Sequence, residues 1–416
     1  MQEPPPLLDK CLGFTRHREL MEEGIYPYFQ PFEESYGPVA RLDGREIIMV
    51  GSNNYLGLTH HPKVKEAAVA ALKRFGTSCS GSRFLNGTLR VHEELERKLA
   101  RFMGKESALV FSTGFQTNLA VISSLAGKGD IVYCDRDNHA SLIDGCRLSF
   151  ATTKKFKHNS MSDLENLIEN HSGNHFTGGR LIAVDGIFSM VGDILDLPGI
   201  VSLAKRHDAC ILLDDAHSLG VLGKGGRGTA EHFGLMDQVD IIMGTFSKSF
   251  ASLGGFIAGE RAVIEYIQHH SRPLIFSASM PPACVATVIT ALDLIQKEPE
   301  MREKLWKNTR RMKREFDRMG FDTGNSETPV IPLIIGSREE TFLFWRKLLD
   351  HGIYANAVTS PAVPPNMDLI RTSYMATHED HHLDRVLEVF EKLGREYAII
   401  DPSRAHPVTS RAAPDS

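Results

Sequence analysis

The chain has 416 residues, of which 42% are hydrophobic and 24% are charged, and its net charge is −5 at pH 7. This composition is ordinary for a soluble globular protein, the length predicts one large and one smaller domain, and the charge gives no sign of a nucleic-acid partner. The six cysteines contain no CxxC pair, which argues against a disulfide framework or a metal site and is typical of a reducing cytosol. The first six residues lack the basic start and apolar run of a signal peptide, so we expect a cytoplasmic protein.

Several short apolar runs are each followed directly by a polar or glycine-rich segment. Helical patterns lie between some of these runs, and such alternation predicts an α/β fold with a parallel sheet that is covered on both faces. Ligands of such sheets bind beyond the carboxyl ends of the strands, where the polar segments fall. The apolar runs cover residues 108–111, 131–134, 181–184, 210–213 and 241–243, and the helical patterns cover residues 163–168 and 197–206.

One further strand breaks the parallel pattern. Only six residues, 249–254, separate Lys248 from the apolar segment 255–258. A parallel crossover needs a dozen or more residues. We therefore expect one antiparallel strand in an otherwise parallel sheet.

The character of the chain changes after about residue 296. We expect a small α+β domain over residues 296–400, after an N-terminal arm over 1–45 and a large domain over 46–295. Residues 401–416 contain three prolines without apolar periodicity, which predicts a disordered tail. The small domain's predicted helices cover 301–319, 340–349 and 379–396, and its predicted strands lie near 330–335, 353–357 and 369–373.

Lys248 is the most informative residue of the chain. It follows the apolar run 241–243, and desolvation at such a position lowers an amine's pKa and makes it nucleophilic, as a Schiff-base lysine requires. Asp214 and His217 follow the apolar run 210–213 in the same way. An acid for a pyridinium nitrogen and a lysine for an aldehyde are the two groups that pyridoxal phosphate (PLP) chemistry demands. We therefore expect PLP as the cofactor.

Three further positions have both a functional and a structural interpretation. Residues 112–115 join a strand to a helix that we expect to begin near Gln116, and they could bind a phosphate or simply cap the helix. His139 could stack on a planar cofactor or be a hydrogen-bonded core histidine. Arg371 lies within an apolar strand, where its guanidinium suits a substrate carboxylate or a structural salt bridge.

Two motifs that resemble other sites are set aside. The segment 223–228 matches GxGxxG, but it does not directly follow a strand or open a clear helix, so it is a weak nicotinamide signal. Residues 378–382 lack the HExxH spacing, and with Thr377 they are typical of the capped start of the last helix.

Taken together, these segments resemble the α-oxoamine synthase family of fold-type I PLP enzymes, from about residue 20 to residue 400. Within that family they are most similar to the bacterial serine palmitoyltransferases. Two departures are Val191, where relatives often have an acid, and the absence of arginine between Arg346 and Arg371. The resemblance rests on residues 52–58, 81–88, 138–141, 185–190, 214–218, 244–248 and 276–280, and the closer likeness on 26–29, 76–83, 111–116, 244–255 and 360–364.

The resemblance implies a role for each candidate site residue. Lys248 would carry the cofactor as a Schiff base, and Asp214 would pair with its pyridinium. Asn53 and Arg371 would hold the amino-acid carboxylate. Because the resemblance also implies a site shared between subunits, we expect an obligate homodimer. The remaining cofactor contacts would be His139 on the ring, His217 and Ser189 at the phenolic oxygen, and, around the phosphate, Ser112, Gly114, Phe115, Thr245, Ser247 and the second subunit's Ser277.

The resemblance also implies a reaction, in which Lys248 removes the Cα proton of L-serine. The expected activity is a decarboxylative Claisen condensation of L-serine with palmitoyl-CoA or a similar acyl-CoA to 3-ketodihydrosphingosine, CoA and CO2. A glycine- or alanine-using member of the family, 8-amino-7-oxononanoate synthase or 2-amino-3-ketobutyrate CoA ligase, is the alternative. A non-catalytic binding protein on the same fold is a more remote one. The sequence leaves open the acyl length, the use of CoA or a carrier protein, and peripheral contact with the inner membrane.

Overall fold

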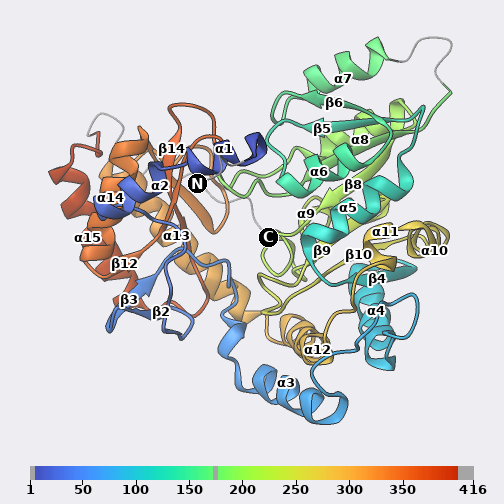
Figure 1. Ribbon diagram of the computed structural model, residues 1–416, viewed down its shortest axis with the longest axis horizontal. Coiled ribbons are helices and arrows are strands. Elements are labelled where there is room, and N and C mark those ends of the chain that lie inside the picture. The colour runs from blue at the N-terminus through green and yellow to red at the C-terminus, as the bar shows by residue number, and fades with distance from the viewer. Residues whose placement is uncertain (1–4, 172–176, 402–416) are drawn as a thin grey trace.

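The computed structural model describes residues 5–171 and 177–401 of the chain (Figure 1). A seven-stranded sheet lies at the centre of the larger part, with the strand order β4-β10-β9-β8-β7-β5-β6. Neighbouring strands from β9 to β6 are parallel, whereas β10 runs antiparallel to both β4 and β9. This confirms the predicted α/β fold with one antiparallel strand. The strands are β4 (Ser107–Phe111), β5 (Ile131–Asp135), β6 (Thr152–Phe156), β7 (Arg180–Asp185), β8 (Cys210–Asp214), β9 (Ile241–Thr245) and β10 (Gly255–Gly259).

Both faces of this sheet are buried, which explains why most of its strands read as continuous apolar runs. Along β5, Ile131 and Tyr133 pack into one hydrophobic core, while Val132 and Cys134 pack into the other. Within residues 5–171 and 177–401, no helix combines the length and the apolar character needed to cross a membrane. The first core is covered by α3 (Pro62–Phe75), α4 (Arg90–Met103), α7 (Met161–Asn170), α8 (Leu197–Arg206) and α12 (Pro282–Lys297), and the second by α5 (Gly114–Leu125), α6 (Ala140–Leu148), α10 (Arg261–His270) and α11 (Arg272–Ile275).

The edge strand β6 is not apparent from the sequence. Its residues are Thr-Thr-Lys-Lys-Phe, of which only Phe156 is buried, and it pairs with β5 alone. Lysines on an edge strand disfavour pairing with another chain. Because this strand has no apolar run, a search for apolar runs does not find it.

The remaining strands form two smaller sheets, with the orders β1-β2-β3-β12 and β11-β14-β13. A single strand was expected near residues 353–357, but this segment divides between the two smaller sheets. Its first part, β12, pairs in parallel with β3, and its second part, β13, pairs antiparallel with β14. The chain changes sheets at Ala355, which is fully buried. The strands are β1 (Glu34–Ser35), β2 (Val39–Leu42), β3 (Arg45–Met49), β11 (Val330–Gly336), β12 (Ile353–Tyr354), β13 (Asn356–Val358) and β14 (Asp368–Ser373).

The N-terminal strands share a hydrophobic core with the C-terminal helices, beside which they lie in Figure 1. Ala40 and Ile47 belong to the same core as Trp345 and Phe390. The boundaries expected at residues 45 and 296 remain predictions, and the expected tail lies outside the described residues apart from Asp401. The helices not yet named are α1 (Pro6–Leu12), α2 (Arg16–Glu22), α9 (Thr229–His232), α13 (Glu300–Met319), α14 (Arg338–Asp350) and α15 (Asp380–Glu396).

The last helix, α15, begins with a different cap from the one expected. Glu379 is the N-cap, and its backbone N–H donates to Nδ1 of His382 over 3.1 Å. The Thr377 hydroxyl is buried and has no hydrogen-bond partner among the described residues. The capping role expected of Thr377 is therefore wrong, because the helix starts too late for its hydroxyl to reach the free N–H groups.

Candidate active site

Lys248 lies in the loop that follows β9, at the carboxyl edge of the large sheet. The buried rings of Phe246 and Phe250 anchor this loop, and the N–H of Phe246 donates to the carbonyl of Gly254 over 2.9 Å. The lysine side chain borders two cavities and is partly accessible from them. Burial of the amine lowers the pKa of Lys248 to about 8, although the charge of Asp214 opposes this shift. The loop thus presents an amine that loses its proton more readily than an ordinary lysine.

Asp214 ends the neighbouring strand β8, in parallel register with β9. Its carboxylate is 3% exposed and accepts hydrogen bonds from the side chain of Asn118 (2.6 Å) and from the N–H of Ala216 (2.9 Å). Asp185 ends β7 and accepts from the N–H of His139 over 2.6 Å. Burial, together with the charge of Asp214, holds the pKa of Asp185 well above its usual value.

His217 is buried beside the same strand end. Its Nδ1 lies 2.7 Å from the phenolic oxygen of Tyr55, which is itself 1% exposed. Burial, and to a smaller extent the charges of Lys248 and Arg371, hold the pKa of His217 well below its usual value. His217 is therefore a neutral hydrogen-bonding group at neutral pH.

The first cavity has a volume of about 300 Å³ and contains most of the predicted cofactor-binding residues. Helix α5 begins at Gly114, two residues before the expected start, and Thr113 caps it by accepting from the N–H of Gln116. The N–H groups of the first helical turn have no carbonyl partner within the helix, so this end suits an anion. A Cβ at Gly114 would lie 2.6 Å from Oγ1 of Thr245, so only glycine fits there without displacement. The predicted residues that line this cavity are Gly114, Phe115, His139, Ser189, Asp214, His217, Thr245, Ser247 and Lys248.

The second cavity, of about 550 Å³, adjoins the first and shares Lys248 and His217 with it. Arg371 on β14 lines this cavity and is 4% exposed. Its guanidinium donates to the carbonyl of Ser189 (2.6 Å), to Oγ of Ser373 (2.9 Å) and to Oδ1 of Asn53 (2.9 Å). The salt-bridge alternative has no support, because no carboxylate of the described residues forms an ion pair with Arg371. A buried guanidinium without a counter-charge is suited to bind an anion.

Two predicted cofactor contacts do not line either cavity. The hydroxyl of Ser112 instead donates to the carbonyl of Ala278. Ser277 lies in the loop after α11, next to the largely exposed Phe276. A role for Ser277 therefore depends on a second subunit and remains a proposal.

Several residues of the site were not predicted from the sequence. The first cavity is also lined by Thr113, Ser141 and Asp185. In addition, Asn118 is hydrogen-bonded to Asp214, and Tyr55 is hydrogen-bonded to His217. Asp185 and Tyr55 lie in segments that the resemblance includes, although no role was assigned to them. For Asn118 no distinct signal was available in the sequence, because it directly follows two other polar residues, Gln116 and Thr117.

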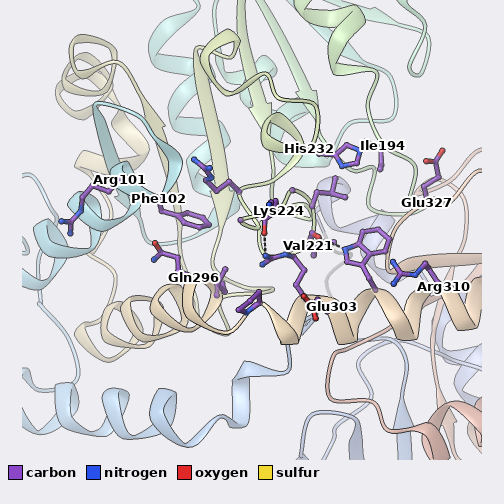
Figure 2. Close-up of a pocket in the computed structure, with 18 residues that line it drawn as sticks. Arg101, Phe102, Ile194, Val221, Lys224, His232, Gln296, Glu303, Arg310 and Glu327 are labelled. Carbon is purple, nitrogen blue, oxygen red and sulfur yellow. Dashed lines mark hydrogen bonds between the residues drawn. The ribbon is translucent and has the colours of Figure 1, made fainter. Parts of the chain in front are cut away.

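A larger depression of the surface, about 1170 Å³, lies elsewhere, between the glycine-rich loop 223–228 and the helices α12 and α13 (Figure 2). Two of its arginines form hydrogen bonds within the fold: Arg227 donates to Glu231 over 2.9 Å, and Arg302 donates to the carbonyl of Lys224. The labelled charged side chains in Figure 2 are spread around the depression and do not converge on one point. We therefore place the active site at the smaller pair of cavities, where the reactive groups meet.

Comparisons with known proteins show the family of this chain. The family model for aminotransferases of class I and II matches residues 45–390. A serine palmitoyltransferase from Sphingobacterium spiritivorum is 49% identical over 391 residues, which cover 94% of this chain and 96% of that protein. An 8-amino-7-oxononanoate synthase from Thermoanaerobacter pseudethanolicus is 43% identical over 391 residues, or 94% of this chain and 98% of that protein. A solved serine palmitoyltransferase from S. paucimobilis with bound PLP-myriocin aldimine has a TM-score of 0.91 at 36% identity and covers 96% of this chain and 100% of that one.

The comparisons and the geometry lead to the same family. The chain spans nearly the full length of these relatives, and Lys248, Asp214 and the N-terminus of α5 lie together at one edge of the sheet. The protein therefore belongs to the class I and II aminotransferase family and, within it, to the α-oxoamine synthases, which are PLP-dependent acyl-transferring enzymes.

Proposed function

We propose that this protein catalyses the decarboxylative condensation of L-serine with a long-chain acyl-CoA to 3-ketodihydrosphingosine, CoA and CO2. The observation that carries the reaction class is the meeting of Lys248, Asp214 and Arg371 at two adjoining cavities. The choice of serine and of a long-chain acyl donor is supported by the relatives named serine palmitoyltransferase.

The residues of the first cavity fit PLP. When bound, PLP supplies an electron sink for negative charge at the substrate Cα. Lys248 would carry the cofactor, and the Asp214 carboxylate would keep the ring nitrogen protonated, because an opposite charge favours the protonated form. His139 would contact the ring. His217 and Ser189 would serve the phenolic oxygen, and the phosphate would be held by Gly114, Phe115, Thr245 and Ser247.

Arg371 would bind the carboxylate of the amino acid, together with Asn53. Their mutual hydrogen bond of 2.9 Å fixes the guanidinium before substrate arrives. A guanidinium already held in place loses less entropy on binding and orients the bond that is to be broken. The same contact excludes amines that lack a carboxylate, because the buried cation would then have no counter-charge.

Lys248 would also move the Cα proton once its amine is free. With a pKa of about 8, a substantial fraction of this amine is neutral near pH 7.5. A general base works best when its pKa lies near the working pH. The loop that buries Lys248 thus supplies both the nucleophile and the base.

The second cavity would accept the acyl donor. The second cavity is walled by aromatic and aliphatic side chains such as Phe29, Tyr354 and Val358. Burial of each methylene of an acyl chain is worth about 0.8 kcal/mol. Activity should therefore rise with chain length until the apolar wall is covered.

We further propose that the enzyme is a homodimer with a shared active site. Ser277 does not line its own chain's cavities, and His139 is exposed in the single chain. A second subunit would cover His139 and bring its Ser277 to the phosphate. Sedimentation of the purified protein tests the oligomeric state, and a monomer with full activity would exclude the shared site.

The alternative within the family is a synthase that uses glycine or alanine. It is favoured by the 43% identity with 8-amino-7-oxononanoate synthase, which is close to the 49% found for serine palmitoyltransferase. The two readings differ in whether the site hydrogen-bonds a substrate hydroxyl. A site built for a hydroxyl rejects an analogue that lacks it far more strongly than an apolar pocket rejects a missing methylene.

A thiol-release assay tests the proposal. CoA release is measured with serine, glycine, alanine and threonine, each against acetyl-, pimeloyl- and palmitoyl-CoA. We expect serine with palmitoyl-CoA to have the highest kcat/KM. If glycine or alanine with a short acyl-CoA is best, the substrate assignment is wrong and only the reaction class stands. Lack of CoA release with every pair would contradict the reaction class as well.

A further inference from the structure

Asn118 occupies an unusual position behind the active site. It lies on α5, one turn after Gly114, and its side chain is fully buried. Its amide nitrogen donates to Oδ2 of Asp214 over 2.6 Å and to Oγ of Ser141 over 2.8 Å. The Ser141 hydroxyl in turn lies 2.8 Å from Nδ1 of His139. A continuous chain of hydrogen bonds therefore joins Asp214 to His139.

The direction of each hydrogen bond in this chain is determined. Nδ1 of His139 also accepts from the backbone N–H of Ser141 over 3.3 Å, so Nδ1 carries no proton. The Ser141 hydroxyl must then donate to Nδ1, and its oxygen is left to accept from Asn118. Both amide hydrogens of Asn118 are used, one on each neighbour. The proton of a neutral His139 ring consequently lies on Nε2.

The amide orientation leaves one polar atom without a partner. Oδ1 of Asn118 is buried and accepts no hydrogen bond from the described residues. Reversing the amide would place this oxygen against the Asp214 carboxylate, where two acceptors repel. A buried orphan acceptor is unfavourable for folding, and such groups in native proteins call for an explanation. The observed orientation therefore gives the Asp214 carboxylate a donor but leaves α5 with a buried, unsatisfied acceptor.

We propose that Asn118 is a positioning residue that holds the Asp214 carboxylate in place and, through Ser141, fixes His139 in its neutral Nε2–H form. Two donors, Asn118 and the N–H of Ala216, then hold the two oxygens of the Asp214 carboxylate in place. Asn118 itself does not line the first cavity, so it acts on the cofactor only through its neighbours. This inference rests on the roles proposed above for Asp214 and His139 in holding PLP.

A purely structural role for Asn118 is the competing explanation, because the same hydrogen bonds join α5 to α6. Thr117, the preceding residue on α5, supplies a matched control. It is also fully buried, and its hydroxyl donates to the carbonyl of Thr113 over 2.9 Å, away from Asp214. Thr117→Val removes one buried hydrogen bond from the same helix without touching the carboxylate.

The test compares Asn118→Leu, Asn118→Asp and Thr117→Val with wild type, each prepared without cofactor and then loaded with PLP. The measurements are the PLP dissociation constant from titration of cofactor-free protein, the pH at which the visible absorbance of the bound cofactor changes, and the thermal midpoint. Asn118→Leu should raise the dissociation constant at least about tenfold, since hydrogen bonds to charged groups are among the stronger ones. The absorbance change should move to higher pH, because a less firmly protonated ring withdraws less charge. Thr117→Val should lower the thermal midpoint but leave both cofactor readouts within about twofold of wild type.

Asn118→Asp keeps the shape of the side chain and covers the case in which the leucine variant fails to fold. A second carboxyl group beside Asp214 should also displace the pH of the absorbance change. If both Asn118 variants only lose thermal stability, as Thr117→Val does, the positioning role is refuted. These readouts need no acyl donor, so a wrong substrate assignment would leave this result unaffected. Wild-type protein that binds no PLP would instead contradict the proposed function itself.

Discussion

Replacing Lys248 by methionine in the cofactor-free protein should make the protein more stable at neutral pH. Burial lowers the pKa of Lys248 from 10.5 to about 8, so the folded protein holds a charged amine in a poorly solvated place. A shift of one pKa unit corresponds to about 1.4 kcal/mol. The shift therefore sets an upper limit of about 3.5 kcal/mol on the stabilisation, and water in the adjoining cavities reduces it.

The pH dependence of this difference identifies its cause. Because the folded-state pKa lies below the unfolded value, the unfolded chain binds more protons between about pH 8 and pH 10.5. Wild-type stability therefore rises with pH across this window relative to the Lys248→Met variant. The advantage of the variant should be full below pH 8 and should disappear as pH approaches 10.5.

Thermal midpoints of both proteins, measured without PLP at one protein concentration from pH 6 to pH 10.5, test this prediction. A fixed concentration is needed because subunit association also changes the midpoint. Groups that do not interact with Lys248 titrate equally in both proteins and cancel in the difference. A constant difference across this range, or a less stable variant at pH 7, would refute the reasoning.

Three further changes test other parts of the site and the fold. Gly114→Ala should raise the PLP dissociation constant about tenfold or more, because the alanine Cβ would lie 2.6 Å from Oγ1 of Thr245. Titration of cofactor-free protein with PLP measures this constant, and an unchanged affinity would contradict the prediction. Arg371→Lys should raise KM for the amino acid by about 10- to 100-fold while the PLP absorbance is retained, because an ammonium cannot form the paired hydrogen bonds of a guanidinium to a carboxylate. An unchanged KM would show that Arg371 does not bind the substrate carboxylate. Two aspartates raise the pKa of His158 to about 10, so the stabilisation by His158 is full below about pH 6.5 and is lost as pH rises to 10. The thermal midpoint of His158→Gln should therefore approach that of wild type over this range. A difference between the two midpoints that does not change with pH would contradict this prediction.

The sequence by itself predicted most strands of the large sheet and the edge at which the candidate site lies. Strands buried on both faces need apolar runs, so β4, β5, β7, β8 and β9 are visible as such in the chain. The short connection after Lys248 predicted the reversed strand, because few residues cannot return a chain to a parallel position. Lys248, Asp214 and Gly114 were found because each lies at the end of one of these strands or within three residues after it. Apolar runs, short connections and polar residues at strand ends are local properties, so they can be recognised from neighbouring residues in the sequence.

Only the tertiary structure decided which distant residues support the site. Asn118 meets Asp214 across 96 positions of the chain, and Arg371 meets Asn53 across 318, a pair that only the resemblance had named together. Such contacts depend on how sheets and helices pack, and no local pattern records them. The edge strand β6 could not be predicted because an edge strand needs no apolar run. The core that the N-terminal strands share with α13–α15 could not be predicted either, because no local sequence pattern at either end of the chain indicates it.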